Sequence, residues 1–269
     1  MSAFILEIQV LPEEARDQEK LKRIVAEKIN LVQDKFEFRL KKRSIDARKK
    51  IVKYNCKVEV IIGAFPEGKT IYFETKNISK QKEVVIIGAG PAGLFAALKA
   101  IQSGIKPIIY ERGKNVQERR RDIAALNKKS LVNPESNYCF GEGGAGTYSD
   151  GKLYTRSKKR GDVETVLKWF VHFGANENIL IDTHPHIGTN KLPNIIQNIR
   201  EEIIKSGGEI HFENKLTDII LGNQKVEAIE LNNSKKIACA NLILATGHSA
   251  RDIYSLLHEK KILIKAKPF

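Results

Sequence analysis

The chain has 269 residues, of which 42% are hydrophobic and 29% are charged, a composition typical of a globular protein with a buried core. It has no apolar run near the roughly 20 residues of a membrane helix. Its first residues lack the basic segment and cleavage site of a signal peptide, so we expect a cytoplasmic protein that does not bind membranes. Three widely spaced cysteines without a CxxC motif argue against a disulfide framework, a zinc site and a redox-active cysteine pair.

The first 80 residues predict a small α+β domain. A helix is expected where apolar residues recur at helical spacing, and strands are expected where apolar and charged residues alternate. Residues 77–82 are polar and predict a linker to a second domain. The expected elements, in chain order, are a strand at 2–10, a helix at 13–30 and strands at 36–40, 51–62 and 71–73.

Residues 81–269 predict a Rossmann-type α/β domain with a mainly parallel sheet, because strands alternate with helices. The strand at 241–245 is expected to be buried. The other expected strands lie at 83–87, 107–110, 209–213, 216–221, 225–231 and 235–238, and the expected helices at 91–102, 112–129, 163–173, 192–205 and 249–258.

A glycine-rich turn follows the first strand of this domain. Gly88, Gly90 and Gly93 have the GxGxxG spacing between an apolar strand and a helix. The first glycine permits the tight turn, the second lets a pyrophosphate approach the backbone, and the third lets the helix pack closely on the strand. Glu111 ends the second strand, where a carboxylate accepts hydrogen bonds from ribose hydroxyls and repels a 2′-phosphate. The turn therefore favours FAD or NAD over NADP.

Two further segments favour FAD over NAD. Residues 137–151 contain four glycines between positions 141 and 146, so this loop has little side-chain bulk and can lie against a flat ring or a phosphate. We expect it to contact the flavin, with Ser149 and Asp150 near the ribityl chain and Lys152 near the reduced flavin or an acidic substrate. The second segment is the Ala-Thr-Gly turn at residues 245–247, after the strand at 241–245.

These segments resemble the flavoproteins with two dinucleotide-binding domains, in which the FAD domain begins with GxGxxG and Glu-Arg and returns with a strand ending in Ala-Thr-Gly beside the cofactor. Residues 140–153, together with 186–189 and 267–269, resemble a bacterial family of FAD-dependent dehydrogenases described as NAD(FAD)-utilising. The resemblance implies an FAD-dependent oxidoreductase with NADH or NADPH as the reductant and a small-molecule substrate. Members of that family continue well past residue 269, so the resemblance also predicts that the chain is part of a longer protein.

The candidate cofactor-binding residues come from the phosphate turn, the Glu-Arg pair, the glycine-rich loop, the start of one later strand and the Ala-Thr-Gly turn. No residue has a pattern that identifies it as catalytic, and no metal site is predicted, because His184 and His186 have only Asp182 nearby as a further ligand. Cys139 is expected to be a buried small hydrophobe. The candidates are Gly88, Gly90, Pro91, Ala92, Gly93, Glu111, Arg112, Gly143, Gly144, Ala145, Gly146, Ser149, Asp150, Lys152, Leu216, Ala245, Thr246 and Gly247.

The net charge of +14 leaves a second interpretation open. Residues 39–53 carry eight basic residues and one acidic residue, and such a stretch either binds RNA phosphates or forms a solvated face. The alternative function is an FAD-binding protein that associates with or modifies RNA through its N-terminal domain. Few aromatic residues accompany the charges and no RNA-binding motif is present, so nucleic acid is not the expected partner. The sequence makes no prediction of the oligomeric state.

Overall fold

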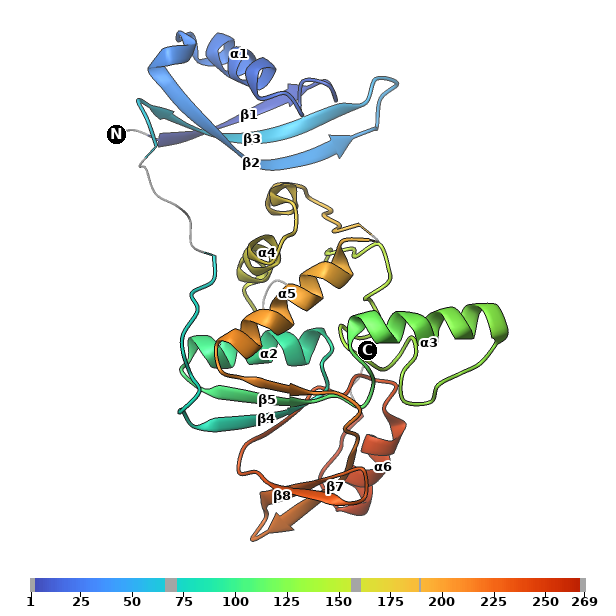
Figure 1. Cartoon of the computed structure of the whole chain (residues 1–269). Coiled ribbons are helices and arrows are strands. Elements are labelled where there is room, and N and C mark those ends of the chain that lie inside the picture. Colours follow the sequence, from blue (N-terminus) through green and yellow to red (C-terminus); the bar gives the residue numbers. More distant parts are fainter. Residues whose placement is uncertain (1–2, 66–71, 156–160, 189, 267–269) are drawn as a thin grey trace. The chain divides into compact units, whose positions relative to one another are not determined.

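Figure 1 shows the computed structural model of the chain, which describes residues 3–65, 72–155, 161–188 and 190–266. The chain divides into two compact units, each built from two separate stretches of sequence. The first unit comprises Met1–Phe73 and Lys152–Gly188, and the second comprises Glu74–Gly151 and Thr189–Phe269.

The first unit contains a three-stranded antiparallel sheet, in the order β1-β3-β2 (Figure 1). The helix begins after Asp17, whose carboxylate accepts hydrogen bonds from two N–H groups of the first turn. The helix packs on one face of the sheet, with Leu21 and Val25 buried against Val58 and Val60. The elements are β1 (Ala3–Val10), α1 (Gln18–Ile29), the single turn η1 (Gln33–Lys35), β2 (Phe36–Asp46) and β3 (Lys53–Ile62).

The segment Lys152–Gly188 groups with the first unit, whereas the sequence analysis placed it in the second domain. The guanidinium of Arg43 on β2 binds both carboxylate oxygens of Asp182, and the closest N–O distance is 2.7 Å. The backbone N–H of Arg43 donates to the carbonyl oxygen of Ile181 at 2.9 Å, and its own carbonyl accepts from the N–H of Thr183 at 3.0 Å. Contacts between positions so far apart in the sequence leave no periodic pattern, so they could not be predicted.

The expected strand at residues 71–73 is a wrong prediction for the part that the structure describes, because neither described residue of this range is in a strand and residue 71 lies outside the described residues. Phe73 is instead buried against Trp169, with the ring centroids 5.5 Å apart and the rings perpendicular. Trp169 belongs to α4 (Val163–His172), which is followed by the turn η2 (Glu177–Leu180). Packing on a helix thus buries this aromatic residue without a sheet.

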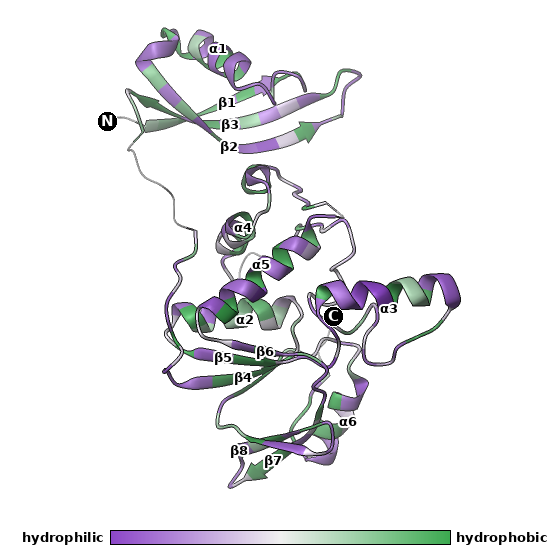
Figure 2. Cartoon of the chain, in the orientation of Figure 1, coloured by the Kyte–Doolittle hydropathy of each residue, from purple (hydrophilic) through white to green (hydrophobic). Residues whose placement is uncertain are grey.

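A four-stranded parallel sheet, in the order β10-β4-β5-β6, forms the centre of the second unit and confirms the predicted Rossmann-type α/β fold. Two helices, α2 and α5, cover one face of this sheet (Figure 1), and α2 is mostly hydrophobic (Figure 2) because its inner side is fully buried. The elements are β4 (Glu83–Ile87), α2 (Pro91–Gln102), β5 (Lys106–Tyr110), α3 (Val116–Lys129), α5 (Leu192–Lys205), β6 (Glu209–His211) and β10 (Leu242–Leu244).

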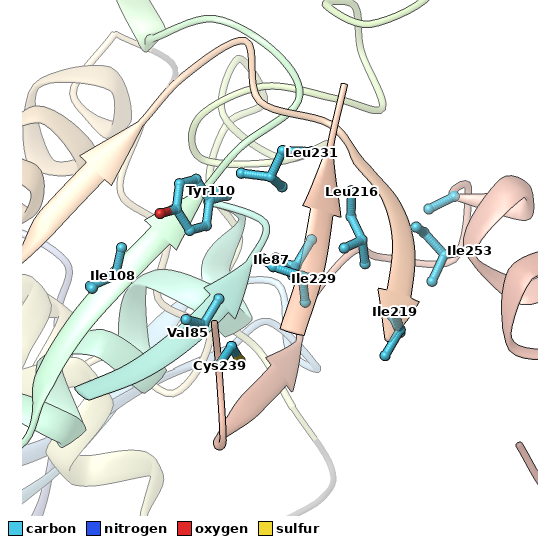
Figure 3. Packing of buried hydrophobic residues seen from close by; sticks show 11 residues of the cluster. Val85, Ile87, Ile108, Tyr110, Leu216, Ile219, Ile229, Leu231, Cys239 and Ile253 are labelled. Atoms are coloured by element: carbon cyan, nitrogen blue, oxygen red, sulfur yellow. The ribbon is translucent and has the colours of Figure 1, made fainter. Parts of the chain in front are cut away.

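An antiparallel sheet, in the order β7-β8-β9, lies on the opposite face of the parallel sheet. Figure 3 shows Ile87 of β4 and Tyr110 of β5 turned towards Ile229 and Leu231 of this second sheet. Removal of these apolar side chains from water is the main force that holds the two layers together. The elements are β7 (Leu216–Gly222), β8 (Lys225–Leu231), β9 (Lys235–Ala238) and α6 (Arg251–Glu259).

Strand β10 is an edge strand and is not buried, so the expectation of a buried strand at 241–245 is wrong. Among the described residues it has β4 as its neighbour on one side, with Ile243 opposite Ile86. The side chains of Ile243 and Leu244 remain 39% and 37% exposed. An apolar run predicts a buried strand only if neighbours lie on both sides of it, and that depends on the strand order.

Candidate functional site

The carboxyl ends of β4, β5 and β10 border a cavity of about 580 Å³ within the second unit. Ligands of open parallel sheets bind at this end of the strands, and cofactor sites typically measure ~300–1,000 Å³. The walls come from the phosphate turn, the end of β5, the glycine-rich loop, the start of β7, the segment after β10 and α6. Five segments that are separate in the sequence therefore meet α6 at one site.

The three glycines of the phosphate turn have different surroundings. Gly88 has a φ of +106° and donates from its N–H to the carbonyl oxygen of Tyr110 at 2.8 Å, and a Cβ there would lie 2.5 Å from the carbonyl oxygen of Ala245. A Cβ on Gly93 would overlap the carbonyl oxygen of Gly88, which explains why the helix needs glycine there. A Cβ on Gly90 would approach no described atom closer than 3.8 Å. Packing inside the protein therefore does not require glycine at position 90. A ligand that approaches the backbone of the turn would require it.

Glu111 is buried, and its carboxylate joins three segments of the backbone. One oxygen accepts from the N–H of Ala89 at 2.7 Å, and the other accepts from Gly113 and Gly141, both at 2.9 Å. A carboxylate has about four lone-pair sites, so these bonds leave room for about one more donor. Glu111 also lines the cavity. It thus ties the phosphate turn to the glycine-rich loop, a role that the sequence analysis did not predict.

The glycine-rich loop contains glycines of two kinds. Gly141, Gly143 and Gly144 all have positive φ. A Cβ on Gly141 would overlap the side chain of Arg119, and a Cβ on Gly143 would overlap an isoleucine of α5. A Cβ on Gly144 would lie 2.9 Å from the proline ring that begins α2. A Cβ on Gly146 would approach nothing closer than 3.9 Å, and its φ is not positive. Three of the four glycines are therefore required by packing inside the protein. Gly146 alone is left for the predicted close approach of a ligand.

Arg119 of α3 holds this loop from the inside. Its side chain is fully buried, and burial lowers the pKa of its guanidinium. Its cation also lies 5.4 Å from the ring centre of Tyr148. The guanidinium donates to the carbonyl oxygens of Asn137 (2.9 Å), Tyr138 (3.1 Å), Gly141 (3.3 Å) and Glu142 (2.7 Å) and to the hydroxyl of Thr147 (3.1 Å).

The carboxylate of Glu142 fixes the loop to two helices. Its Oε2 atom accepts from the N–H of Val116, the first residue of α3, and from Arg200 of α5, each at 2.7 Å. The Oε1 atom is buried and has no hydrogen-bond partner among the described residues. Burial raises the pKa of Glu142 to about 7, although Arg200 and the bond from Val116 act in the opposite direction.

Arg112 belongs to a closed network of two cations and two carboxylates. Its guanidinium lies 2.5 Å from Glu135 and 3.0 Å from Asp252, and the ammonium of Lys215 lies 3.0 Å and 3.3 Å from the same two carboxylates. The guanidinium also stacks over Phe140, at 4.1 Å from the ring centre. Arg112 therefore borders the cavity as a flat, charge-compensated wall and is not a free cation.

Thirteen of the predicted residues line the cavity and five do not. Of the five, Gly93 and Gly143 are packed inside the protein as described above. The hydroxyl of Ser149 donates to the carbonyl oxygen of Gly146 at 2.7 Å and accepts from the N–H of Gly151 at 3.1 Å. Asp150 and Lys152 also lie outside the lining. The lining residues among the predicted ones are Gly88, Gly90, Pro91, Ala92, Glu111, Arg112, Gly144, Ala145, Gly146, Leu216, Ala245, Thr246 and Gly247.

The cavity also has lining residues that the sequence analysis did not select. Cys139, expected to be buried, is exposed and lines the cavity, so that prediction is wrong. His248 directly follows the Ala-Thr-Gly turn, and this adjacency was a signal that could have identified it. Asn214, Lys215 and Tyr254 had no recognisable pattern, since only the fold brings β7 and α6 to this site.

His184, His186 and the basic stretch 39–53 are not among the residues that line the cavity. His184 packs edge-on against Tyr154, and no group of three or more His, Cys, Asp or Glu residues that could hold a metal ion occurs among the residues that the structure describes. In the basic stretch 39–53, Lys41 pairs with Glu59, Arg43 with Asp182 and Arg48 with Asp46. No helix in the described ranges is long and apolar enough to cross a membrane. Thr189 and residues 267–269, which belong to the segments that resemble the dehydrogenase family, lie outside the described residues.

Comparison with protein families decides the class of this fold. Residues 82–263 match the pyridine nucleotide-disulphide oxidoreductase family. The chain belongs to this family. Residues 1–61 match a domain of unknown function. The description of the oxidoreductase family names a disulphide, and the three cysteines of this chain are free thiols.

Individual relatives are similar over different parts of the chain. An uncharacterized protein of Clostridium beijerinckii is 39% identical over 272 residues, which cover 94% of this chain and 50% of that protein. A dual trans-enoyl reductase/FAD-dependent monooxygenase of Aspergillus terreus is 27% identical over 153 residues, 54% of this chain and 19% of that protein. The solved thioredoxin reductase of Lactococcus lactis is 17% identical, with a TM-score of 0.33, and the match covers 62% of this chain and 36% of that one. The chain thus spans half or less of the length of these relatives.

Proposed function

We propose that this chain is the FAD-binding part of a flavin-dependent dehydrogenase and that FAD binds in the cavity at the ends of β4, β5 and β10. The observation that carries the proposal is that the phosphate turn, Glu111 and the Ala-Thr-Gly turn line one cavity, although more than a hundred residues of sequence separate the Ala-Thr-Gly turn from the other two. Membership of an oxidoreductase family supports the same assignment.

The residues present fit a dinucleotide. The first turn of α2 has no capping side chain, so its N–H groups and the positive end of the helix dipole remain for a diphosphate. Gly90 leaves the space through which the diphosphate reaches them. The remaining lone pair of Glu111 suits a ribose hydroxyl, and its negative charge disfavours a 2′-phosphate.

The protein's own groups bind and orient the cofactor in this proposal. FAD supplies the hydride chemistry when bound, and NADH or NADPH is the proposed reductant. Gly146 offers an unobstructed backbone surface beside the phosphate turn, and the flat Arg112–Phe140 pair forms another wall of the same cavity. Cys139 and His248 are two of the lining side chains with ionisable groups suited to proton transfer, and they are the first candidates for mutagenesis.

The alternative RNA-associated function receives less support from the side-chain contacts. Three of the eight cations in residues 39–53 are paired with carboxylates of this chain, and Arg39 lies over the ring of Phe65 at 3.8 Å. Each such pairing removes charge that RNA phosphates would need. We therefore favour a small-molecule substrate.

The test is a titration of the purified protein with FAD, FMN and NAD in separate experiments. Binding of the two flavins is measured by their absorbance, and binding of all three ligands is measured by the heat released or absorbed. We expect FAD to bind and FMN to bind much more weakly, because FMN lacks the second phosphate and the adenosine that the turn and Glu111 would hold. Equal affinity for FMN and FAD would contradict the placement of the adenosine at Glu111. Binding of NAD in preference to FAD would contradict the assignment of the cavity to a flavin.

A further inference from the structure

Glu142 is a fully buried carboxylate beside the cavity, although it does not line the cavity itself. Its neighbours in the sequence connect it to the site: Gly141 and Gly144 are lining residues, and the N–H of Gly143 donates to the carbonyl oxygen of Ala89 in the phosphate turn at 2.8 Å. The buried carboxylate of Glu142 therefore belongs to the same short loop as residues that line the cavity. A buried charge acts on a nearby bound ion with less screening than an exposed one.

The ionisable groups around Glu142 come from every element that packs on it. Arg200 of α5 binds its carboxylate directly, and Arg119 of α3 donates to its carbonyl oxygen. Glu111 lies close enough to raise the pKa of Glu142 by repulsion, and Tyr148 of the loop is a further neighbour. Two arginines thus face two carboxylates, and protonation of Glu142 leaves one positive charge in excess.

The remaining charged neighbours form a pair of their own. The N–H of Glu142 donates to the carbonyl oxygen of Lys114 at 3.1 Å, and the ammonium of Lys114 binds Asp122 at 3.0 Å. This pair is neutral as a whole and leaves the balance of the arginines and carboxylates unchanged. Glu142 differs from the other carboxylates of the cluster in that its Oε1 atom is buried and has no hydrogen-bond partner among the described residues.

We propose that Glu142 is a specificity-determining residue that takes up a proton from solvent when an anionic dinucleotide enters the cavity. Protonation of its carboxylate leaves one positive charge of the Arg119–Arg200 pair in excess, and this positive charge favours a ligand with a diphosphate. The inference rests on the proposed dinucleotide site. The pKa of Glu142, which burial raises to about 7, supports it, because the proton is then exchanged near neutral pH.

Calorimetric titration with FAD tests this proton uptake. The binding enthalpy is measured near pH 7 in several buffers with different ionisation enthalpies, and its slope against the buffer ionisation enthalpy gives the number of protons taken up per FAD. We expect the wild type to take up on the order of half a proton per FAD, because Glu142 is already partly protonated at a pH near its own pKa in the protein without FAD. FAD has no group that titrates near this pH, so the proton must be bound by the protein.

The variant Glu142→Gln separates this residue from other groups such as His248. Its amide oxygen can replace Oε2 and accept from both Val116 and Arg200, while its NH2 group takes the position of Oε1. We expect FAD binding with little or no proton uptake in this variant. The matched control is Glu201→Gln, an exposed position next to Arg200 on α5, which should keep the wild-type uptake.

A second variant keeps the proposal testable if Glu142→Gln does not fold. Arg200→Gln removes the attraction that lowers the pKa of Glu142, so the pH of maximal proton uptake should rise. Three outcomes would each overturn this inference and leave the proposed FAD site intact. The wild type could bind FAD with a binding enthalpy that does not depend on the buffer ionisation enthalpy, or Glu142→Gln could take up as many protons as the wild type. The third outcome is that the pH of maximal proton uptake is the same in Arg200→Gln as in the wild type. If the wild type shows no binding of FAD at all, the proposed function is overturned, and this inference with it.

Discussion

The N–H of Gly143 donates a 2.8 Å hydrogen bond to the carbonyl oxygen of Ala89, so the glycine-rich loop is bonded directly to the phosphate turn. Glu111 reinforces the connection, because its carboxylate accepts from Ala89 on one side and from Gly141 on the other. The two segments therefore act as one rigid wall of the cavity, and a change in the loop has consequences at the turn.

Gly146→Ala should lower the affinity for FAD without weakening the fold. A Cβ at this position meets nothing closer than 3.9 Å, so the free energy of unfolding should stay within about 0.5 kcal/mol of the wild-type value. Gly144→Ala, in contrast, should cost about 2 kcal/mol, because its φ is +70° and the new Cβ would press on Pro91. Urea unfolding followed by circular dichroism gives both stabilities. Equal destabilisation by the two substitutions would show that Gly146, too, is required by packing.

Gly93→Ala should destabilise the second unit by about 3 kcal/mol or more, because the Cβ would overlap the carbonyl oxygen of Gly88 and the helix would have to move away from β4. The first unit should unfold as before, and the fluorescence of Trp169, the single tryptophan of the chain, reports on it. Circular dichroism should show an early loss of structure that the fluorescence does not. A variant as stable as the wild type would contradict the close contact between α2 and the turn.

Glu142→Gln should change how stability depends on pH. The pKa of Glu142 is raised from 4.5 in the unfolded chain to about 7 in the folded protein, so the folded state binds the proton more tightly. Protonated Glu142 contributes about 3 kcal/mol to the free energy of unfolding of the wild type. This contribution is complete below about pH 4.5 and is lost as the pH rises through about 7. The glutamine variant lacks this loss. Urea unfolding at both ends of this pH range should show its advantage growing with pH, and a constant difference would contradict the assignment.

Asp182→Ala should destabilise the first unit by about 2 kcal/mol, because it leaves the half-buried guanidinium of Arg43 without its carboxylate partner. The fluorescence of Trp169 during urea unfolding measures the effect. The control is Glu7→Ala, which removes an exposed ion pair with Lys57 and should change the transition much less. If both substitutions had equal effects, the segment around Asp182 would not be held by this ion pair.

Local patterns predicted the elements around the site well, because each is either a short apolar run or an amphipathic segment bounded by turn residues. The bounds of β4 (Glu83–Ile87), α2 (Pro91–Gln102) and α5 (Leu192–Lys205) agree with those expected from the sequence. The position of Glu111 beside the phosphate turn also followed from its spacing, since parallel neighbouring strands end at the same edge of the sheet.

Features that depend on long-range packing could not be predicted. Four glycines in the loop at 141–146 look alike in the sequence, yet three are required by internal contacts and Gly146 is not. Arg119 has the same local setting as the two arginines that follow it, but only Arg119 is buried, because the loop folds back around its guanidinium. The exposure of β10 and Cys139 was missed for the same reason: neighbours in space decide burial, and they are not neighbours in sequence.

The most direct test of the proposed FAD site is the dissociation constant of FAD for the wild type and for Gly90→Val. The substituted side chain meets no protein atom closer than 3.8 Å at its Cβ, so the protein should fold, but its methyl groups would occupy the path of the diphosphate. Gly161→Val, another glycine with open surroundings but outside the cavity lining, is the matched control. We predict that Gly90→Val loses at least about tenfold in FAD affinity, which corresponds to about 1.4 kcal/mol, while Gly161→Val binds like the wild type. Wild-type FAD affinity in a folded Gly90→Val protein would contradict the proposed site.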